Sequence, residues 1–229
     1  MEFGKAFSFV FDDEEWLKKI GLAGVISLIP LIGQFVIVGW GFEIIRRVIE
    51  EDPVPLPDFR EFGDFLVKGL LVSLVALVFF LPVILVQGCN ASLIPFLERG
   101  DEAVGTAFGI LTSCIVCLTL VYSLVMGFIL PAAVGNYAAK GEMGAAFRFG
   151  EVFQLVRKNL GGYLLVILGS WVAGLIASLG VIACVIGVLF TSVYASAVTS
   201  HLVGQAYNQA SGGGAEALEA EEPIPAGDL

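Results

Sequence analysis

Two cysteines at the spacing Cys114-x-x-Cys117 are the first residues whose types and spacing could carry out chemistry. In a soluble protein this spacing is typical of a redox dithiol or of half a zinc site. Here both cysteines lie within 37 uncharged residues, Ala103 to Ala139. Apolar surroundings disfavour the thiolate, which is the reactive and metal-binding form of cysteine. We therefore expect two small core residues rather than a redox or metal site.

The single histidine and one glutamate are the next candidates. His201 lies near the inner end of the last apolar segment, without an evident carboxylate partner or second metal ligand. We expect a structural or interfacial role, with a ligand or proton-relay role as the alternative. Glu43 precedes Arg46 and Arg47 by three and four residues, a spacing that favours an ion pair on a helix at the membrane surface. The alternative for Glu43 is a buried functional carboxylate.

Other chemistry has few residues to support it. The sequence offers no nucleophile beside a base, no phosphate-binding loop and no cluster of metal ligands. We predict no catalytic residue, no cofactor, no metal and no enzymatic activity. The formal net charge of -10 also makes nucleic acid an unsuitable partner. Cys89 and Cys184 stand apart, and whether they form a disulfide stays open.

The composition indicates a membrane protein. Hydrophobic residues make up 57% of the 229 residues and charged residues 15%, and the mean hydropathy is +0.90. This predicts an all-α integral membrane protein with the lipid bilayer as its surroundings. No cleavable signal peptide is expected, because four acids at positions 12–15 precede any long apolar run. We place one membrane domain at residues 1–208 and a disordered acidic tail at 209–229.

The 23 uncharged residues from Ile20 to Phe42 decide the expected topology. About 20 apolar residues suffice for a spanning helix, but Pro30 and Gly33 favour a break and a reversal. Because Lys and Arg collect on the cytoplasmic side, we prefer a re-entrant hairpin over residues 20–49 to a single span. The hairpin puts 11 of the 12 basic residues inside, whereas a single span puts eight inside and four outside. We also expect other helices to cover Pro30. The residues that set this topology are Lys18, Lys19, Arg46, Arg47, Arg157 and Lys158.

Longer apolar segments predict four full transmembrane helices, at about residues 69–87, 104–125, 160–179 and 181–204. We expect the second to continue, bent at Pro131, and the last two to be joined by a turn at Gly180. Residues 88–102 should form an outside loop, and both termini should be cytoplasmic. Amphipathic interfacial helices are expected at residues 3–17, from Phe59 to Phe65, and from Phe149 to Leu160.

A short internal repeat accompanies this pattern. The string Ala6-Phe7-Ser8-Phe9, followed by Lys18-Lys19-Ile20-Gly21, is similar to Ala146-Phe147-Arg148-Phe149 followed by Arg157-Lys158-Asn159-Leu160-Gly161. In each half an amphipathic helix is expected to end in a basic pair and to lead into an apolar hairpin. Repeats of this kind occur in many transporters and also in inert helix bundles, and chance similarity is the alternative.

Several motifs together resemble one known family. They are Trp16-Leu17-Lys18-Lys19-Ile20-Gly21, Ile29-Pro30-Leu31-Ile32, Gly39-Trp40-Gly41, Arg46-Arg47, Leu56-Pro57-Asp58-Phe59, Pro131-Ala132 and Ala145-Ala146-Phe147-Arg148-Phe149. Over roughly residues 5 to 205 the chain resembles the archaeal and bacterial domain-of-unknown-function family number four thousand and thirteen. The resemblance implies a multi-pass prokaryotic membrane protein and supplies no activity. We expect the protein in the cytoplasmic (inner) membrane.

Small residues at helical spacing suggest what the protein does. Such residues let membrane helices approach closely, so we expect a scaffold or accessory subunit that packs against other membrane proteins or against itself. The alternative is a permease or channel component for a neutral or lipidic solute, with an intramembrane enzyme as a distant third. Polar contacts for such a solute could come from Gln34, Gln87, Asn90 and Asn136. The predicted packing residues are Pro30, Gly33, Gly105, Gly109, Pro131, Gly174, Gly180, Ser192 and Ser196.

Overall fold

The computed structural model describes residues 2–97 and 102–212, and within these ranges the chain forms helices and no strand. The fold is therefore all-α, as the composition predicts. The helices are α1 (Phe3–Ser8), α2 (Trp16–Ser27), α3 (Ile32–Ile49), η1 (Phe59–Glu61), α4 (Phe62–Leu97), α5 (Glu102–Lys140), η2 (Met143–Phe147), α6 (Phe149–Lys158), α7 (Leu160–Leu179), η3 (Gly180–Ala183) and α8 (Cys184–Ser211).

Four helices are long and apolar enough to cross a membrane. They are found at Phe59–Leu93, which covers η1 and most of α4, and at Ala103–Lys140, Leu160–Leu179 and Gly187–Ser211, which lie in α5, α7 and α8. A helix satisfies its own backbone hydrogen bonds and so tolerates hydrocarbon. The membrane-protein class and the four expected spans are thus confirmed in number and order.

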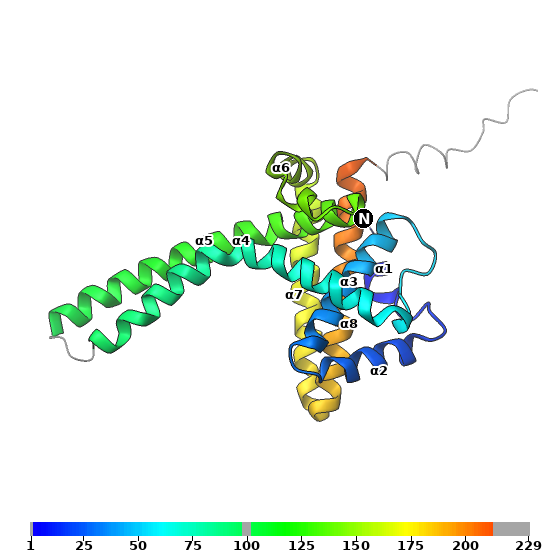
Figure 1. Cartoon of the computed structure of the whole chain (residues 1–229), viewed down its shortest axis with the longest axis horizontal. Coiled ribbons are helices and arrows are strands. Elements are labelled where there is room, and N and C mark those ends of the chain that lie inside the picture. The colour runs from blue at the N-terminus through cyan, green and yellow to red at the C-terminus, as the bar shows by residue number, and fades with distance from the viewer. Residues whose placement is uncertain (1, 98–101, 213–229) are drawn as a thin grey trace, which may run out of the picture.

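The long helices form two arms that diverge from a common body (Figure 1). α4 and α5 lie side by side as a long hairpin that leaves the body. α7 and α8 pack against each other as a second hairpin, which turns at η3. α3 contacts both α4 and α8, and therefore joins the two arms.

The N-terminal apolar stretch is divided into α2 and α3 by the segment around Pro30. The N–H of Ile32 donates to the carbonyl of Pro30 at 2.7 Å, which closes a γ-turn centred on Leu31. Leu31 has a φ of 63°, in the left-handed region that a leucine rarely adopts. Gly33 packs behind the turn, where a Cβ atom would lie 2.1 Å from the carbonyl oxygen of Ile26.

This geometry confirms a helical hairpin broken at Pro30. One expectation about it is wrong, however, because Pro30 and its neighbours Leu28, Ile29 and Leu31 are exposed rather than covered by other helices. The turn satisfies its backbone locally, through the bond from Ile32 to Pro30 and a second from Gly33 to Ile29 at 2.9 Å. It therefore does not need a protein cover.

α3 is the most enclosed element of the body, and glycines allow its close approach to α4. A Cβ atom on Gly39 would lie 1.8 Å from the carbonyl oxygen of Phe65, and one on Gly69 would lie 1.7 Å from that of Phe35. The two backbones are therefore in direct contact at this crossing. On the α8 side, a Cβ atom on Gly41 would lie 2.7 Å from the hydroxyl oxygen of Ser200.

Two apolar cores pack the body. One is formed by side chains of the N-terminal segment and of the helices from α4 through α8. Its fully buried members include Val75, Ala132, Tyr163, Val166, Val198 and Leu202. The other lies between α2, α3, the chain before α4, and α8, and its fully buried members include Val10, Val36, Trp40, Ile44, Leu56 and Val193.

The arms are longer than expected. α4 continues to Leu97, so residues 88–97, expected in an outside loop, extend the helix instead. α5 runs through Pro131 as one helix of 39 residues. At ~1.5 Å per residue it is ~58 Å long, well beyond the bilayer core. A proline removes one backbone hydrogen bond, and membrane helices tolerate that loss.

The N-terminal segment differs from its expected form. α1 ends at Ser8 and α2 begins at Trp16, so residues 3–17 do not form one amphipathic helix. Lys18 and Lys19 lie in the first turn of α2, whereas Arg157 and Lys158 lie in the last turn of α6. The two halves of the expected repeat therefore place their basic pairs at opposite helix ends.

The cysteines do not lie where the sequence suggested. Cys114 and Cys117 are exposed on α5, so the expectation of core residues is wrong. Their sequence surroundings are apolar because the arm itself is apolar, not because protein encloses it. Cys89 is a free, exposed thiol. The side chain of Cys184 lies outside the described residues, as do residues 213–229 of the expected tail.

Candidate functional site at the polar base

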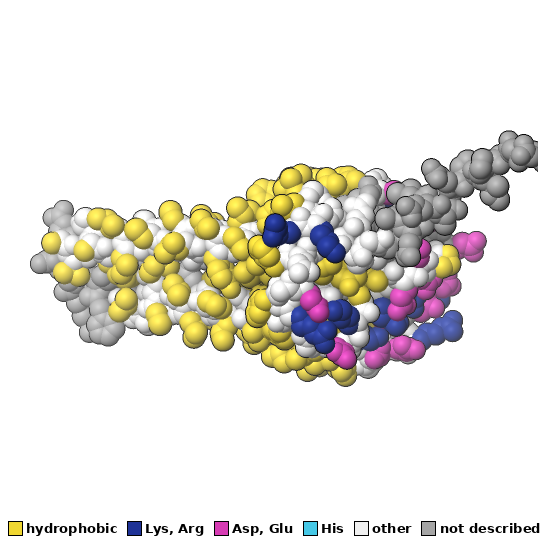
Figure 2. Space-filling model, turned by 90° about the horizontal axis from the view of Figure 1, so that it is seen from above, with side chains coloured by type: hydrophobic (Ala, Val, Ile, Leu, Met, Phe, Trp, Pro, Cys, Tyr) yellow, Lys and Arg dark blue, Asp and Glu magenta, His cyan; other side chains and the backbone are white. Residues whose placement is uncertain are grey.

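Charged side chains gather on the body, whereas the α4–α5 arm shows hydrophobic side chains along the visible face (Figure 2). We call one part of this charged region the polar base. It consists of the chain from residue 13 through the first turn of α2, α3 from Trp40 onward, the connector at residues 50–58 and the first turns of α4. This is the part of the chain in which functional groups from distant positions meet.

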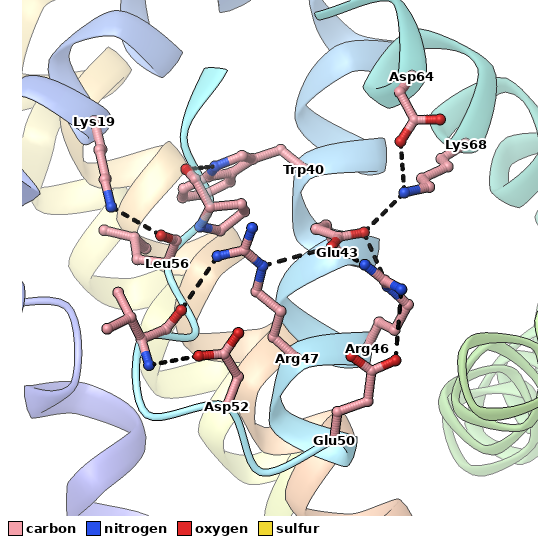
Figure 3. Close-up of polar contacts among 12 residues, drawn as sticks. Lys19, Trp40, Glu43, Arg46, Arg47, Glu50, Asp52, Leu56, Asp64 and Lys68 are labelled. Atoms are coloured by element: carbon pink, nitrogen blue, oxygen red, sulfur yellow. Dashed lines mark hydrogen bonds and ion pairs between the residues drawn. The ribbon is translucent and has the colours of Figure 1, made fainter. Parts of the chain in front are cut away.

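Glu43 is the centre of the polar base (Figure 3). Its residue is only 4% exposed. Its carboxylate accepts hydrogen bonds from Arg46, with Nε at 3.2 Å, and from Lys68 of α4, with Nζ at 2.9 Å. Arg47 adds a longer contact, with Nε 3.5 Å from the same carboxylate. Asp64 and Glu50 pair with Lys68 and Arg46 in turn, so the cluster is balanced in charge.

The electrostatics keep Glu43 ionised. Burial by itself raises the pKa of this carboxyl, but the hydrogen bonds and charges of Arg46 and Lys68 lower it by more. The net pKa is below the ordinary value of 4.5. A poised acid or base would need a pKa near neutrality. The geometry therefore supports a structural ion cluster and not a catalytic carboxylate.

Lys19 forms the second buried ionic contact. Its Nζ lies 2.7 Å from a carboxylate oxygen of Asp13 and 3.2 Å from one of Asp58, and donates to the carbonyl of Leu56 at 2.9 Å. The hydrogen bond from Lys19 holds the pKa of Asp58 below its ordinary value. One ammonium group thus ties α2 to the segment before it and to the connector.

Two further donors fix the connector. Nε1 of Trp40 donates to the carbonyl of Pro57 at 3.0 Å, and Nη1 of Arg47 donates to that of Val54 at 3.2 Å (Figure 3). Prolines leave this connector with few backbone donors of its own. Its carbonyls are therefore satisfied by side chains of α2 and α3, and Phe59 stacks on Trp40 with ring centroids 5.7 Å apart.

A smaller polar contact joins α5, α6 and α8. Nδ2 of Asn136 donates to the carbonyl of Ala145 at 2.9 Å and to the carboxylate of Glu151 at 3.1 Å. Lys140 pairs with the same carboxylate and, as the largest cause, holds the pKa of Glu151 below its ordinary value. The hydroxyl of Tyr207 lies 3.5 Å from the side-chain oxygen of Asn136.

The predicted topology residues divide into two kinds. Lys19, Arg46 and Arg47 are held by the polar contacts above. Lys18 is exposed and pairs with Glu15 at 3.1 Å. Arg157 and Lys158 are exposed on α6.

The predicted packing residues also divide. Gly33 and Gly180 are in tight turns, and a Cβ atom on Gly180 would lie 2.2 Å from the hydroxyl oxygen of Thr191. By contrast, a Cβ atom on any of three other glycines would meet nothing within 4 Å; these are Gly105, Gly109 and Gly174. Ser192 is exposed, Ser196 is half-buried opposite Gly41, and Pro131 is half-buried within α5.

An open cavity of about 600 Å³ lies beside the connector. The N-terminal segment, the connector and the C-terminal half of α8 line it, and His201 is among its lining residues. Within the described ranges, no group of three or more His, Cys, Asp or Glu side chains could hold a metal ion.

Sequence reasoning missed three members of the polar base. Lys68, Asp13 and Trp40 meet their partners only through the packing of α2, α3 and α4, and Lys68 follows Glu43 by 25 residues. One signal was present for Lys68, which is the last basic residue before a long apolar run and therefore lies at the start of a span.

Comparison with known proteins identifies a family and nothing finer. A family model described as "Protein of unknown function (DUF4013)" matches residues 22–186. No curated protein and no solved structure matches the chain. The matched range takes in α3, the connector, the α4–α5 arm and α7, and it ends at the start of α8. It is narrower than the resemblance over residues 5 to 205. Because the family model covers well over half of the 229 residues, the chain belongs to the DUF4013 family of proteins of unknown function.

Proposed function

We propose that this protein is a non-enzymatic scaffold or accessory subunit of a membrane complex, which binds another integral membrane protein along the α4–α5 arm. The observation that carries this proposal is the unused small-residue face of α5. Gly105 and Gly109 lie one helical turn apart, and both have open space beside them. Small residues at this spacing let two membrane helices approach closely.

The rest of the arm fits the same role. Its segments at residues 69–97 and 103–139 carry no Asp, Glu, Lys, Arg or His. In addition, the other parts of the chain leave the most apolar stretch of α5 almost entirely uncovered. Apolar exposure alone fits contact with lipid, and the adjacent glycines add the shape that a partner helix needs. The occupant that we propose is a helix of another membrane protein.

The polar residues that could contact a solute in the permease alternative are paired within the chain instead. Gln87 donates to the hydroxyl of Thr119 at 3.3 Å, and the hydroxyl of Thr112 donates to Asn90 at 3.2 Å, so these two pairs link α4 to α5. The side chain of Gln34 donates to the carbonyl of Ser27 at 3.3 Å. Asn136 is held within the α5–α6 contact. These pairings favour a subunit over a solute pathway.

We further propose a prokaryotic cytoplasmic membrane, with both termini on the cytoplasmic side. In support, the two ends of the described chain meet each other and the C-terminal end of α3, which carries Arg46 and Arg47. Gln205 of α8 donates to the carbonyl of Glu2 at 3.4 Å, and Asn208 donates to that of Val48 at 3.1 Å. Single cysteines near Lys5 and near Glu50, in a Cys-free chain, should both resist an impermeant thiol reagent in intact cells. Labelling of only one would mean that residues 20–45 span.

The experiment for the subunit proposal is purification from native membranes in a mild detergent, with native mass spectrometry. The wild-type chain should carry a stoichiometric integral membrane partner, which Gly105→Leu/Gly109→Leu should lose. Gly88→Leu is the matched control, because Gly88 also has open space but lies on α4. It should keep the partner.

Two outcomes would contradict the proposal. The first is a wild-type chain that purifies as a monomer, with no other protein bound. The second is a complex that contains only copies of this chain, which would mean that the α4–α5 arm mediates self-association. Solute flux in vesicles reconstituted with the chain alone would favour the permease alternative.

A further inference from the structure

The open cavity beside the connector has the dimensions of a small-molecule site. Its volume of about 600 Å³ lies within the range of ~300–1,000 Å³ typical of ligand pockets. Its apolar walls include Phe9, Val48, Pro53 and Pro55. Its polar lining comes from three separate parts of the chain, so folding is what assembles it.

The rim of this cavity carries more negative than positive charge. Five carboxylates line it, against one lysine: Glu2, Asp12, Asp13, Glu51 and Asp52. Glu2 pairs with Lys5 at 3.4 Å, and Asp13 pairs with Lys19 at 2.7 Å. The other three make no ion pair with any described residue. An excess of acidic groups around a hollow favours a cation.

The lining also contains buried polar groups with unused hydrogen-bonding capacity. His201 is only 4% exposed, and its ring stacks on Phe9 with centroids 4.3 Å apart. Its Nδ1 lies 3.3 Å from the side-chain nitrogen of Gln205, while its Nε2 has no hydrogen-bond partner among the described residues. The side-chain oxygen of Gln205 is buried without a partner as well.

One rearrangement uses both groups. Exchanging the oxygen and nitrogen of the Gln205 amide places its oxygen opposite Nδ1 of His201, where it accepts the Nδ1–H. The bond of 3.4 Å to the carbonyl of Glu2 is lost, and the amide nitrogen takes the buried position that the oxygen held. Nε2 of His201, a residue that lines the cavity, is then unprotonated and can accept a hydrogen bond from an ammonium group.

We propose that this cavity binds a small organic polycation, an alkyl diamine or triamine. Its ammonium groups pair with the rim carboxylates and with Nε2 of His201, and its methylene groups lie along the apolar walls. A bare metal ion fits less well, because no group of three or more potential ligands is assembled in the described ranges. The site is independent of the lateral contact proposed for α5.

Isothermal titration calorimetry of the full-length protein in detergent tests the proposal, with spermidine and 1,8-diaminooctane as probes. Both should bind saturably, whereas uncharged 1,8-octanediol should not. Asp12→Asn/Asp52→Asn should weaken spermidine binding at least tenfold. The asparagine at position 52 keeps the oxygen that accepts from the N–H of Val54, so the connector should stay folded.

The control is Glu14→Gln/Glu61→Gln, which removes the same charge from two exposed residues outside the cavity. It should change the affinity less than threefold. His201→Phe keeps an aromatic ring against Phe9 and should weaken binding several-fold. The proposal is overturned if no amine binds saturably, if the diol binds as well as the diamine, or if the control weakens binding as much as the rim variant.

Discussion

Nζ of Lys68 donates to the carboxylate of Glu43 at 2.9 Å, across the crossing at which Gly39 and Gly69 bring the backbones of α3 and α4 into contact. The ionic contact and the glycine contact fix the same pair of helices. α3 also packs on α8, so this crossing determines how the two arms are held together.

Lys68→Met should lower the free energy of unfolding by about 1–3 kcal/mol, because a buried carboxylate loses one of its charged donors. Arg46 remains as a partner, which limits the loss. Chemical unfolding in detergent measures the effect. Adding Glu43→Gln to Lys68→Met should recover part of the loss, and a double variant that is simply additive would mean that the two residues are not coupled.

Two adjacent lysines provide a matched pair. Lys19→Met should cost about 2–4 kcal/mol, since it leaves Asp13 and the carbonyl of Leu56 without their buried donor. Lys18→Met removes only an exposed ion pair and should change stability by at most ~0.5 kcal/mol. Equal unfolding midpoints for the two variants would contradict the role assigned to Lys19.

Substitutions of a packed and of an unpacked glycine should also differ in their effect on stability. Gly39→Ala should cost about 2 kcal/mol or more, because its Cβ atom would overlap the backbone of α4 and the helices must move apart. Gly109→Ala meets nothing within 4 Å and should leave the isolated chain as stable as before or slightly more stable. A thermal shift assay compares them. A destabilised Gly109→Ala would show that α5 packs differently within the chain.

Acid should remove the contribution of the Glu43 carboxylate to the stability of the folded protein. This carboxyl has a folded pKa below its ordinary value of 4.5, so its stabilising effect is complete above the unfolded pKa and is lost as the pH falls through the folded pKa. The difference in unfolding midpoint between wild type and Glu43→Gln should be constant from pH 8 to pH 6 and should narrow below about pH 4.5. A difference that stays constant to pH 3 would contradict this.

The sequence was sufficient for features that depend on local composition. Pro30 breaks the N-terminal stretch because a proline lacks the amide hydrogen, and the four long helices follow from runs without charge. The ion pair from Glu43 to Arg46 and Arg47 follows from helical spacing alone.

Features that depend on packing could not be predicted. The partners of Lys19 include Asp58 and Leu56, which are far away in the chain, and no sequence periodicity predicts these contacts. Sequence also does not distinguish Gly105, which is unpacked, from Gly39, which contacts the backbone of α4. Cys114 was expected in a core because an apolar sequence does not distinguish a side chain facing protein from one facing lipid.

Site-specific photo-crosslinking in native membranes tests the central claim most directly, because it reports contacts of the arm before detergent is added. A photoreactive residue at Gly109 should give one defined cross-link to another integral membrane protein. The same residue at Leu118, which is 71% exposed and about half a turn further round α5, should cross-link mainly to lipid. Equal cross-linking to lipid at both positions, with no protein adduct at Gly109, would contradict a subunit role for this protein.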